Sequence, residues 1–286
     1  MIPAEFDYFA PSSVKEATEL LQREPRAKVL AGGMSLIPAM KHRLAQPSAI
    51  VDIGRIDGLD GVAERRGRLT FGGRVTHARI GAASELASFP IFAEAAAEIG
   101  DAQVRNRGTL GGSLVHADPA ADWSAVFLAL DGEARVVGPR GERTIAAADF
   151  FAGMLTSALH HDEILTEVQM TCERGRAGAA YAKMRQPASG FAIVGVAAEL
   201  VLDRRGRCEK AAIAITGTNP VPFRAASIEA RLRGETLDAG SLARLCDPIE
   251  ELEPMEDLHA SAEYRRHLAS VYARRALVGA LSRAGA

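Results

Sequence analysis

The chain has 286 residues, and its 34 Lys and Arg side chains against 36 Asp and Glu give a formal net charge of −2. A chain so close to neutral has no global basic field, so nucleic acid is a poor first candidate for a partner. Three scattered cysteines, Cys172, Cys208 and Cys246, are too few for a disulfide framework, a Cys₄ zinc site or a Cys-ligated iron–sulfur cluster. No apolar run reaches about 18 residues and the first 13 residues do not resemble a signal peptide, so we expect a cytoplasmic protein.

The first 55 residues predict a small unit in which helices and strands alternate. Ser13-x-x-Glu16 resembles a capping box, and it precedes apolar residues at helical spacing in residues 14–23. The elements expected after it are a strand at 28–30, a helix at 36–44 and a buried strand at 49–53.

From about residue 56 the pattern changes to strands mixed with Ala-rich helices. The expected elements, in chain order, are a strand at 69–73, a helix at 84–99, a long Gly/Asp segment at 106–122, a helix at 123–130, a hairpin around Gly138–Gly141 and a strand at 163–170.

Residues 174–178 are charged, Gly-rich and without periodicity, which is typical of a linker. Strands are expected beyond it at 180–184, 192–202 and 210–216, followed by a helix over 259–281. This last third therefore predicts a sheet with helices packed on one face, an α+β unit.

One candidate binding segment is Lys28-Val-Leu-Ala-Gly-Gly-Met-Ser-Leu36, a small-residue turn between a strand and a helix. Gly32 and Gly33 have no Cβ, so the main chain can approach an anion closely there, and Ser35 can add a hydroxyl donor. A tight turn without a ligand is the alternative. The spacing fits neither GxGxxG nor GxxxxGK[ST], which excludes the Rossmann and P-loop motifs.

A second segment, Arg107-Gly-Thr-Leu-Gly-Gly-Ser113, again places paired glycines beside hydroxyl residues. Two such turns would suit a pyrophosphate, and the acidic residue downstream, Asp122, would suit a ribose hydroxyl. The alternative for this downstream stretch is a surface loop whose acidic residue caps the next helix.

The histidines lack partners at metal-ligand spacing, so structural or solvent-exposed roles are expected for His77 and for the His160–His161 pair. His116 alone is placed near a cofactor, by its position inside the second glycine segment.

Residues 31–41 and 108–122 resemble the two flavin-binding signatures of the FAD-binding medium subunit of molybdenum hydroxylases, the family of carbon monoxide dehydrogenase and xanthine dehydrogenase. Residues 181–194 resemble the segment that follows the FAD domain in that family. The resemblance implies a two-subdomain FAD-binding domain of the vanillyl-alcohol-oxidase type over 1–174, with subdomains of about 1–55 and 56–174. It also implies a C-terminal α+β domain over 175–286.

Carried over position by position, the resemblance implies that two stretches enclose the FAD pyrophosphate. It also implies that Asp122 holds a ribose hydroxyl, that Ile99 and Leu165 pack near the flavin or adenine, and that Lys183 lies near the isoalloxazine ring. The residues of the two stretches are Leu30, Ala31, Gly32, Gly33, Met34, Ser35 and Leu36, and Thr109, Leu110, Gly111, Gly112 and Ser113.

Two positions depart from the family pattern. Met34 stands where relatives often carry His or Gln, and Ser113 replaces a frequent Asn or Asp. A polar side-chain contact from position 34 is therefore not expected, whereas the Ser113 hydroxyl can still donate or accept a hydrogen bond. Neither change removes the backbone contacts.

The resemblance further implies an oxidoreductase subunit that transfers electrons through FAD, with no catalytic residue and no metal on this chain. Its partners would be a large molybdopterin subunit and a small subunit with [2Fe–2S] clusters, in a dimer of heterotrimers. Two alternatives stay open: a self-sufficient flavin oxidoreductase of the same fold, and a redox-inactive nucleotide-binding assembly module. The substrate and the electron acceptor are not implied by these residues.

Overall fold

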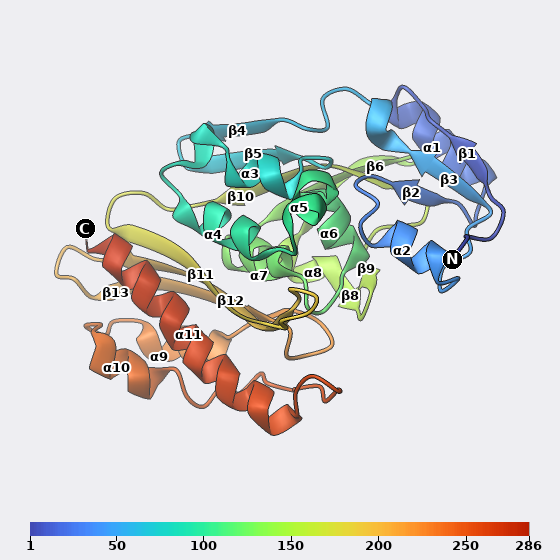
Figure 1. Cartoon of the computed structure of the whole chain (residues 1–286). Coiled ribbons are helices and arrows are strands. Elements are labelled where there is room, and N and C mark those ends of the chain that lie inside the picture. Colours follow the sequence, from blue (N-terminus) through green and yellow to red (C-terminus); the bar gives the residue numbers. More distant parts are fainter. Residues whose placement is uncertain (286) are drawn as a thin grey trace.

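Three larger β-sheets, each with its own buried cluster, organise the molecule (Figure 1). The computed structural model describes residues 1–285. We call the elements from β1 to η1 the N-terminal unit, those from β4 to β10 the middle unit, and those from β11 to α11 the C-terminal unit. None of the helices formed by the described residues is long and apolar enough to cross a membrane.

The N-terminal unit is a parallel sheet of order β1-β3-β2 with a helix after each of its first two strands. Ser13 caps the first helix by accepting from the Glu16 N–H, but the Glu16 carboxylate accepts from Ser12, so only half of the predicted capping box forms. The elements are β1 (Asp7–Phe9), α1 (Val14–Arg23), β2 (Lys28–Leu30), α2 (Leu36–Lys41), β3 (Ala49–Asp52) and the 3₁₀ helix η1 (Ile53–Arg55).

The middle unit is an antiparallel sheet of order β4-β5-β10-β6-β7 packed against short helices. Its strands are β4 (Val62–Arg65), β5 (Arg68–Gly72), β6 (Glu133–Gly138), β7 (Gly141–Ala146) and β10 (Ile164–Thr171), with a separate pair β8 (Phe151–Gly153) and β9 (Thr156–Ser157). Its helices are α3 (His77–Gly81), the 3₁₀ helix η2 (Ser84–Leu86), α4 (Pro90–Glu98), α5 (Ala102–Arg107), α6 (Leu110–His116), α7 (Asp122–Ala129) and α8 (Ala147–Phe150).

One of the expected elements in the middle unit is wrong. The helix expected over 84–99 is split, because Pro90 begins α4 at a position where its missing N–H costs no hydrogen bond. The Gly/Asp segment 106–122, for which the sequence predicts no particular element, contains α6, because Leu110 and Leu114 lie one turn apart and are both fully buried. Burial of that face outweighs the low helix propensity of the glycines.

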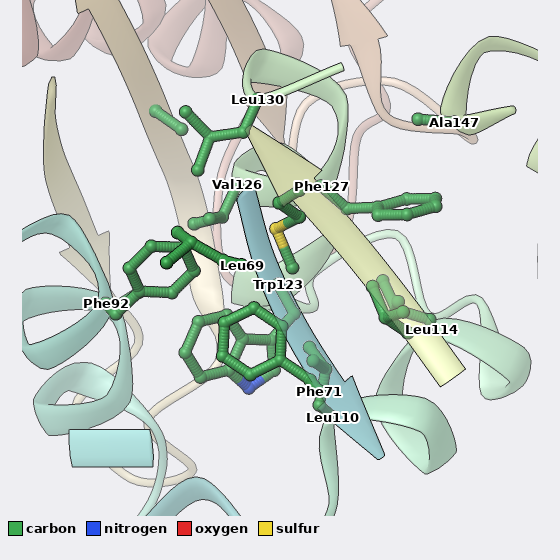
Figure 2. Packing of buried hydrophobic residues seen from close by; sticks show 14 of the residues in the cluster. Leu69, Phe71, Phe92, Leu110, Leu114, Trp123, Val126, Phe127, Leu130 and Ala147 are labelled. Atoms are coloured by element: carbon green, nitrogen blue, oxygen red, sulfur yellow. The ribbon is translucent and has the colours of Figure 1, made fainter. Parts of the chain in front are cut away.

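The core of the middle unit gathers around Trp123, which is fully buried on α7 (Figure 2). The Phe92 ring lies 6.5 Å from the Trp123 ring, and Phe71 from β5 lies 5.2 Å from Phe92, measured between centroids. This core therefore joins the sheet, α4 and α7 into one packed layer.

The C-terminal unit is an antiparallel sheet of order β11-β12-β13-β14 with the long helix α11 lying across β11 and β12 (Figure 1). Its own helices cover one face, as expected, and α4 and α7 of the middle unit cover the other. Both faces of β12 are therefore buried, which explains why its sequence is apolar except for Glu199. The elements are β11 (Ala177–Arg185), β12 (Ala192–Leu202), β13 (Cys208–Thr216), β14 (Phe223–Arg224), α9 (Ala226–Leu232), α10 (Ala239–Leu245) and α11 (Ala262–Ala284).

Candidate functional site

The two predicted glycine segments meet backbone to backbone. A Cβ on Gly32 would overlap the carbonyl oxygen of Arg107 and lie 2.9 Å from the Cα of Gly108. Gly33 has a φ of +77°, a conformation that L side chains rarely adopt. The glycines at these positions are therefore required by close approach and by backbone conformation, and they bring the first segment, which follows β2, against the second.

The first segment presents unpaired backbone donors. Within residues 1–285, no hydrogen-bond acceptor lies in bonding geometry to the N–H groups of residues 32–35. The Ser35 side chain is also free, because it does not cap α2, and Met34 and Ser35 are both exposed. Consecutive backbone N–H groups of this kind form a concave site for an anion, so this stretch fits the phosphate oxygens of a dinucleotide.

The second segment is anchored by a third glycine pair, Gly72–Gly73, which the sequence predicts only as the end of the strand at 69–73. A Cβ on Gly111 would overlap the carbonyl oxygen of Gly73, and a Cβ on Gly73 would overlap that of Leu165. The Thr109 hydroxyl caps α6 by accepting from the Gly112 N–H at 3.1 Å. Gly112 is exposed and Ser113 half-buried, so this end of the segment is open to a ligand. In the sequence, the paired glycines at residues 72–73 are the feature that could have indicated this close backbone contact.

Asp122 and Lys183, which the resemblance placed at different parts of the cofactor, form a buried ion pair. The Lys183 Nζ lies 2.7 Å from the Asp122 Oδ1, and the Tyr181 hydroxyl donates to the same oxygen at 2.6 Å. Burial raises the pKa of the Asp122 carboxyl, while the Lys183 ammonium and the Tyr181 hydroxyl act against that rise. Because Asp122 is the buried first residue of α7, and not its cap, the alternative of a capping residue in a surface loop is wrong.

Lys183 also donates to two backbone carbonyls, Glu98 at 2.9 Å and Gly190. Its ammonium therefore has three acceptors within the protein, and its side chain is fully buried. Ile99 follows directly after Glu98 at the end of α4 and is partly buried against the middle core. The pair thus joins β11 to α4 and α7.

Two residues that sequence reasoning did not assign to the site, His77 and Trp123, connect the ion pair to the glycine segments. Trp123, next to Asp122, donates its Nε1–H to the His77 Nδ1 at 2.9 Å, and the His77 backbone N–H donates to the Gly108 carbonyl at 3.0 Å. Both side chains are buried. By contrast, His116, which was placed near the cofactor, is exposed at the end of α6.

A cavity of about 240 Å³ lies away from the glycine segments, between the middle and C-terminal units, with Phe89, Glu199 and Arg283 among its lining residues. None of the predicted site residues lines it. Among residues 1–285, no group of three or more His, Cys, Asp or Glu side chains is placed to hold a metal ion.

Comparisons with known proteins agree with this geometry. The model for the FAD binding domain in molybdopterin dehydrogenase matches residues 4–170, and that for the CO dehydrogenase flavoprotein C-terminal domain matches residues 179–280. The carbon monoxide dehydrogenase medium chain of Hydrogenophaga pseudoflava is 37% identical over 99% of both chains. The nicotine 6-hydroxylase medium subunit of Paenarthrobacter nicotinovorans is 36% identical over 96% of this chain and 97% of that subunit.

A solved structure supports the fold directly. The chain matches a chain in the structure of carbon monoxide dehydrogenase from Hydrogenophaga pseudoflava that lacks the Mo-pyranopterin moiety of the molybdenum cofactor. The TM-score is 0.94 at 36% identity, over 99% of both chains. The predicted family, the two-part α+β fold, FAD as the cofactor and the oxidoreductase class are therefore confirmed.

Proposed function

Since this chain belongs to the family that combines the FAD binding domain in molybdopterin dehydrogenase with the CO dehydrogenase flavoprotein C-terminal domain, we propose that it is the FAD-carrying electron-transfer subunit of a heteromeric molybdenum hydroxylase. Bound FAD would supply a redox centre that accepts electrons from [2Fe–2S] clusters of a partner subunit and passes them to an external acceptor. The chain itself binds and orients the cofactor.

The observation that carries the proposal is the meeting of the two glycine segments beside a row of unpaired N–H groups. We assign the pyrophosphate to residues 30–36 and 109–113, with contacts from the backbone and from the Ser35 hydroxyl. Asp122 is assigned to a ribose hydroxyl, and Lys183 to the neighbourhood of the isoalloxazine ring. Since the Lys183 ammonium already has three acceptors, it would act there as a fixed positive charge that also holds Asp122 in place.

Two further assignments extend the proposal. The FAD-binding domain would span 1–174, with subdomains of about 1–55 and 56–174, and the C-terminal domain 175–286. Support comes from residues 172–176, which connect β10 in one sheet to β11 in another. The leucine and isoleucine positions, Leu165 and Ile99, would pack near the flavin or adenine.

The partners would be a large molybdopterin subunit and a small iron–sulfur subunit, in a dimer of heterotrimers. The relatives named medium chain and medium subunit support a multi-subunit complex. A cytoplasmic location is proposed because all three cysteines are free, buried thiols, as expected of a protein kept in a reducing compartment.

The test is to purify the complex and the isolated chain, and to compare wild type with Gly33→Asp and with Gly61→Asp. We expect yellow wild-type protein that releases FAD on denaturation, and little FAD in Gly33→Asp, where an anion replaces a residue of positive φ. Gly61→Asp is the matched control, because a Cβ there meets nothing within 4 Å. Equal FAD in all three proteins would refute the assigned site.

The same preparation separates the proposal from the two alternatives. Substrate turnover by the isolated chain, with no partner subunits present, would favour a self-sufficient flavin oxidoreductase. A colourless chain that cannot be loaded with FAD would favour a redox-inactive module. We expect neither result.

A further inference from the structure

A buried histidine lies directly beside the contact between the two glycine segments. His77 begins α3 and is 5% exposed, and a Cβ placed on Gly108 would lie 2.7 Å from its Nε2. Gly108 in turn faces Gly32, whose Cβ would lie 2.9 Å from the Gly108 Cα. The missing side chain at Gly108 therefore lets the Nε2 pack close to the contact between the two segments.

The hydrogen bond from Trp123 determines where the imidazole carries its proton. An indole N–H can only donate, so the His77 Nδ1 that receives it at 2.9 Å must be unprotonated. Burial, helped by the nearby Arg105 guanidinium, lowers the pKa of His77 to about 4, which keeps the ring neutral at physiological pH. The single ring proton is then on Nε2, which becomes a neutral donor.

This donor has no acceptor within the protein. Among residues 1–285, no hydrogen bond from the His77 Nε2 is found, and this nitrogen is not one of the fully buried atoms without a partner, so it keeps a small exposed surface. A ligand that reaches this exposed nitrogen can supply the acceptor that the protein does not.

We propose that the Nε2–H of His77 donates a hydrogen bond to a phosphate oxygen of the dinucleotide held by the glycine segments, with Trp123 as the positioning residue that fixes the donor tautomer. This rests on the proposed function. A phosphate oxygen is the matching acceptor, because the unpaired N–H groups of residues 32–35 adjoin the same contact and favour a phosphate there. Because the His77 ring is neutral, it can donate this hydrogen bond without changing its charge near physiological pH.

The test measures binding of FAD to the full-length chain freed of cofactor, by flavin fluorescence, together with competition by ADP. ADP carries the pyrophosphate without the flavin, so a bond to phosphate must affect both ligands. The main variant is the double change His77→Phe with Trp123→Phe, which removes both partners of the buried hydrogen bond and leaves no unpaired indole N–H. We expect FAD and ADP affinities to fall together by about tenfold, the effect of one hydrogen bond to a charged group.

Two single variants separate the donor from the packing. His77→Gln places an amide N–H at a similar reach, while its carbonyl can accept from Trp123, so we expect most of the affinity to return. Trp123→Phe keeps the histidine but frees its tautomer, so we expect a smaller loss of affinity. The imidazole ¹⁵N shifts of His77 should then change from a single Nε2–H tautomer to a mixture, a readout that a purely structural role would not move.

Wild-type affinity for FAD and ADP in a folded double variant would overturn the inference while leaving the proposed function intact. Failure of the wild-type chain to bind either ligand would overturn the proposed function first. Weak binding by the double variant without recovery in His77→Gln would assign the loss to packing, and would also count against the donor.

Discussion

Around the glycine segments backbone packs directly on backbone, whereas the boundary between the middle and C-terminal units is held by charged side chains. Gly32 and Gly111 each leave no room for a Cβ. At the boundary, Lys183 pairs with Asp122 and Arg283 pairs with Glu94. Adding atoms should therefore disrupt the packing of the glycine segments. Removing one charge while its partner stays should destabilise the boundary between the units.

The largest effect is expected from Lys183→Met. This change leaves the Asp122 carboxylate buried without its cation, and breaking a buried pair in this way costs about 3–5 kcal/mol of unfolding free energy. Urea denaturation of the chain measures the loss. Because the pair joins β11 to α4 and α7, the boundary between the units should loosen with it.

The control for this prediction is the double variant Asp122→Asn with Lys183→Met. It removes both charges, and the Tyr181 hydroxyl keeps an oxygen acceptor, so most of the lost stability should return. A single variant as stable as wild type would show that the pair does not hold the boundary.

At the glycine segments, His77 predicts a dependence of stability on pH. Its pKa is lowered from 6.5 to about 4, so the folded state favours the neutral ring. The neutral His77 ring therefore contributes about 3 kcal/mol to the free energy of unfolding. This contribution is fully present above pH 6.5 and is lost as the pH falls through about 4. Unfolding free energies measured from pH 7.5 to 4 should fall less steeply in the double variant His77→Phe with Trp123→Phe than in wild type.

Glu199, in the cavity at the boundary, predicts the opposite slope. Burial raises its pKa to about 7, and within residues 1–285 its Oε2 has no hydrogen-bond partner. The folded state therefore favours the protonated acid. The contribution of the protonated Glu199 to the free energy of unfolding is present below pH 4.5 and is lost as the pH rises through 7. The pKa of about 7 already includes the opposing effect of Lys210, 3.7 Å away, and the loss is at most about 3 kcal/mol.

The variant that tests this is Glu199→Gln, which keeps the shape and removes the titration. We expect it to be more stable than wild type at pH 8.5 and about equally stable at pH 5, as measured by urea denaturation. Equal stability at both pH values would mean that the carboxyl stays ionised in the folded protein.

The glycine segments were predictable from the sequence because their requirement is local. Paired glycines between a strand and a helix show that the backbone turns tightly, and two such segments together predict a shared ligand. The family resemblance then supplied the fold. The sequence does not show that Gly73 lies between Gly111 and Leu165, because its contact with Leu165 depends on the register of β5 against β10.

The charged boundary was far less predictable, for a physical reason. Asp122 and Lys183 were each predicted as separate binding residues, since nothing in the sequence shows that the Lys183 side chain of β11 reaches Asp122 at the start of α7. Similarly, His77 and Trp123 are distant in sequence and meet only because α3 and α7 share one core. Long-range pairings of this kind depend on how sheets and helices stack. The periodicity of apolar residues and the spacing of motifs along the sequence do not show how they stack.

The smallest expected effect on stability comes from Gly32→Ala, which adds a single methyl group at the contact between the glycine segments. The new Cβ would overlap the Arg107 carbonyl oxygen, so the two segments must separate, which we expect to cost about 1–3 kcal/mol of unfolding free energy. Gly61→Ala is the control, because its Cβ meets nothing and a compatible glycine-to-alanine change is neutral or slightly stabilising. FAD content should fall far more than stability in Gly32→Ala, whereas in Lys183→Met stability should fall most. If both variants lost FAD and stability in the same proportion, the glycine segments and the charged boundary would be one cooperative structure.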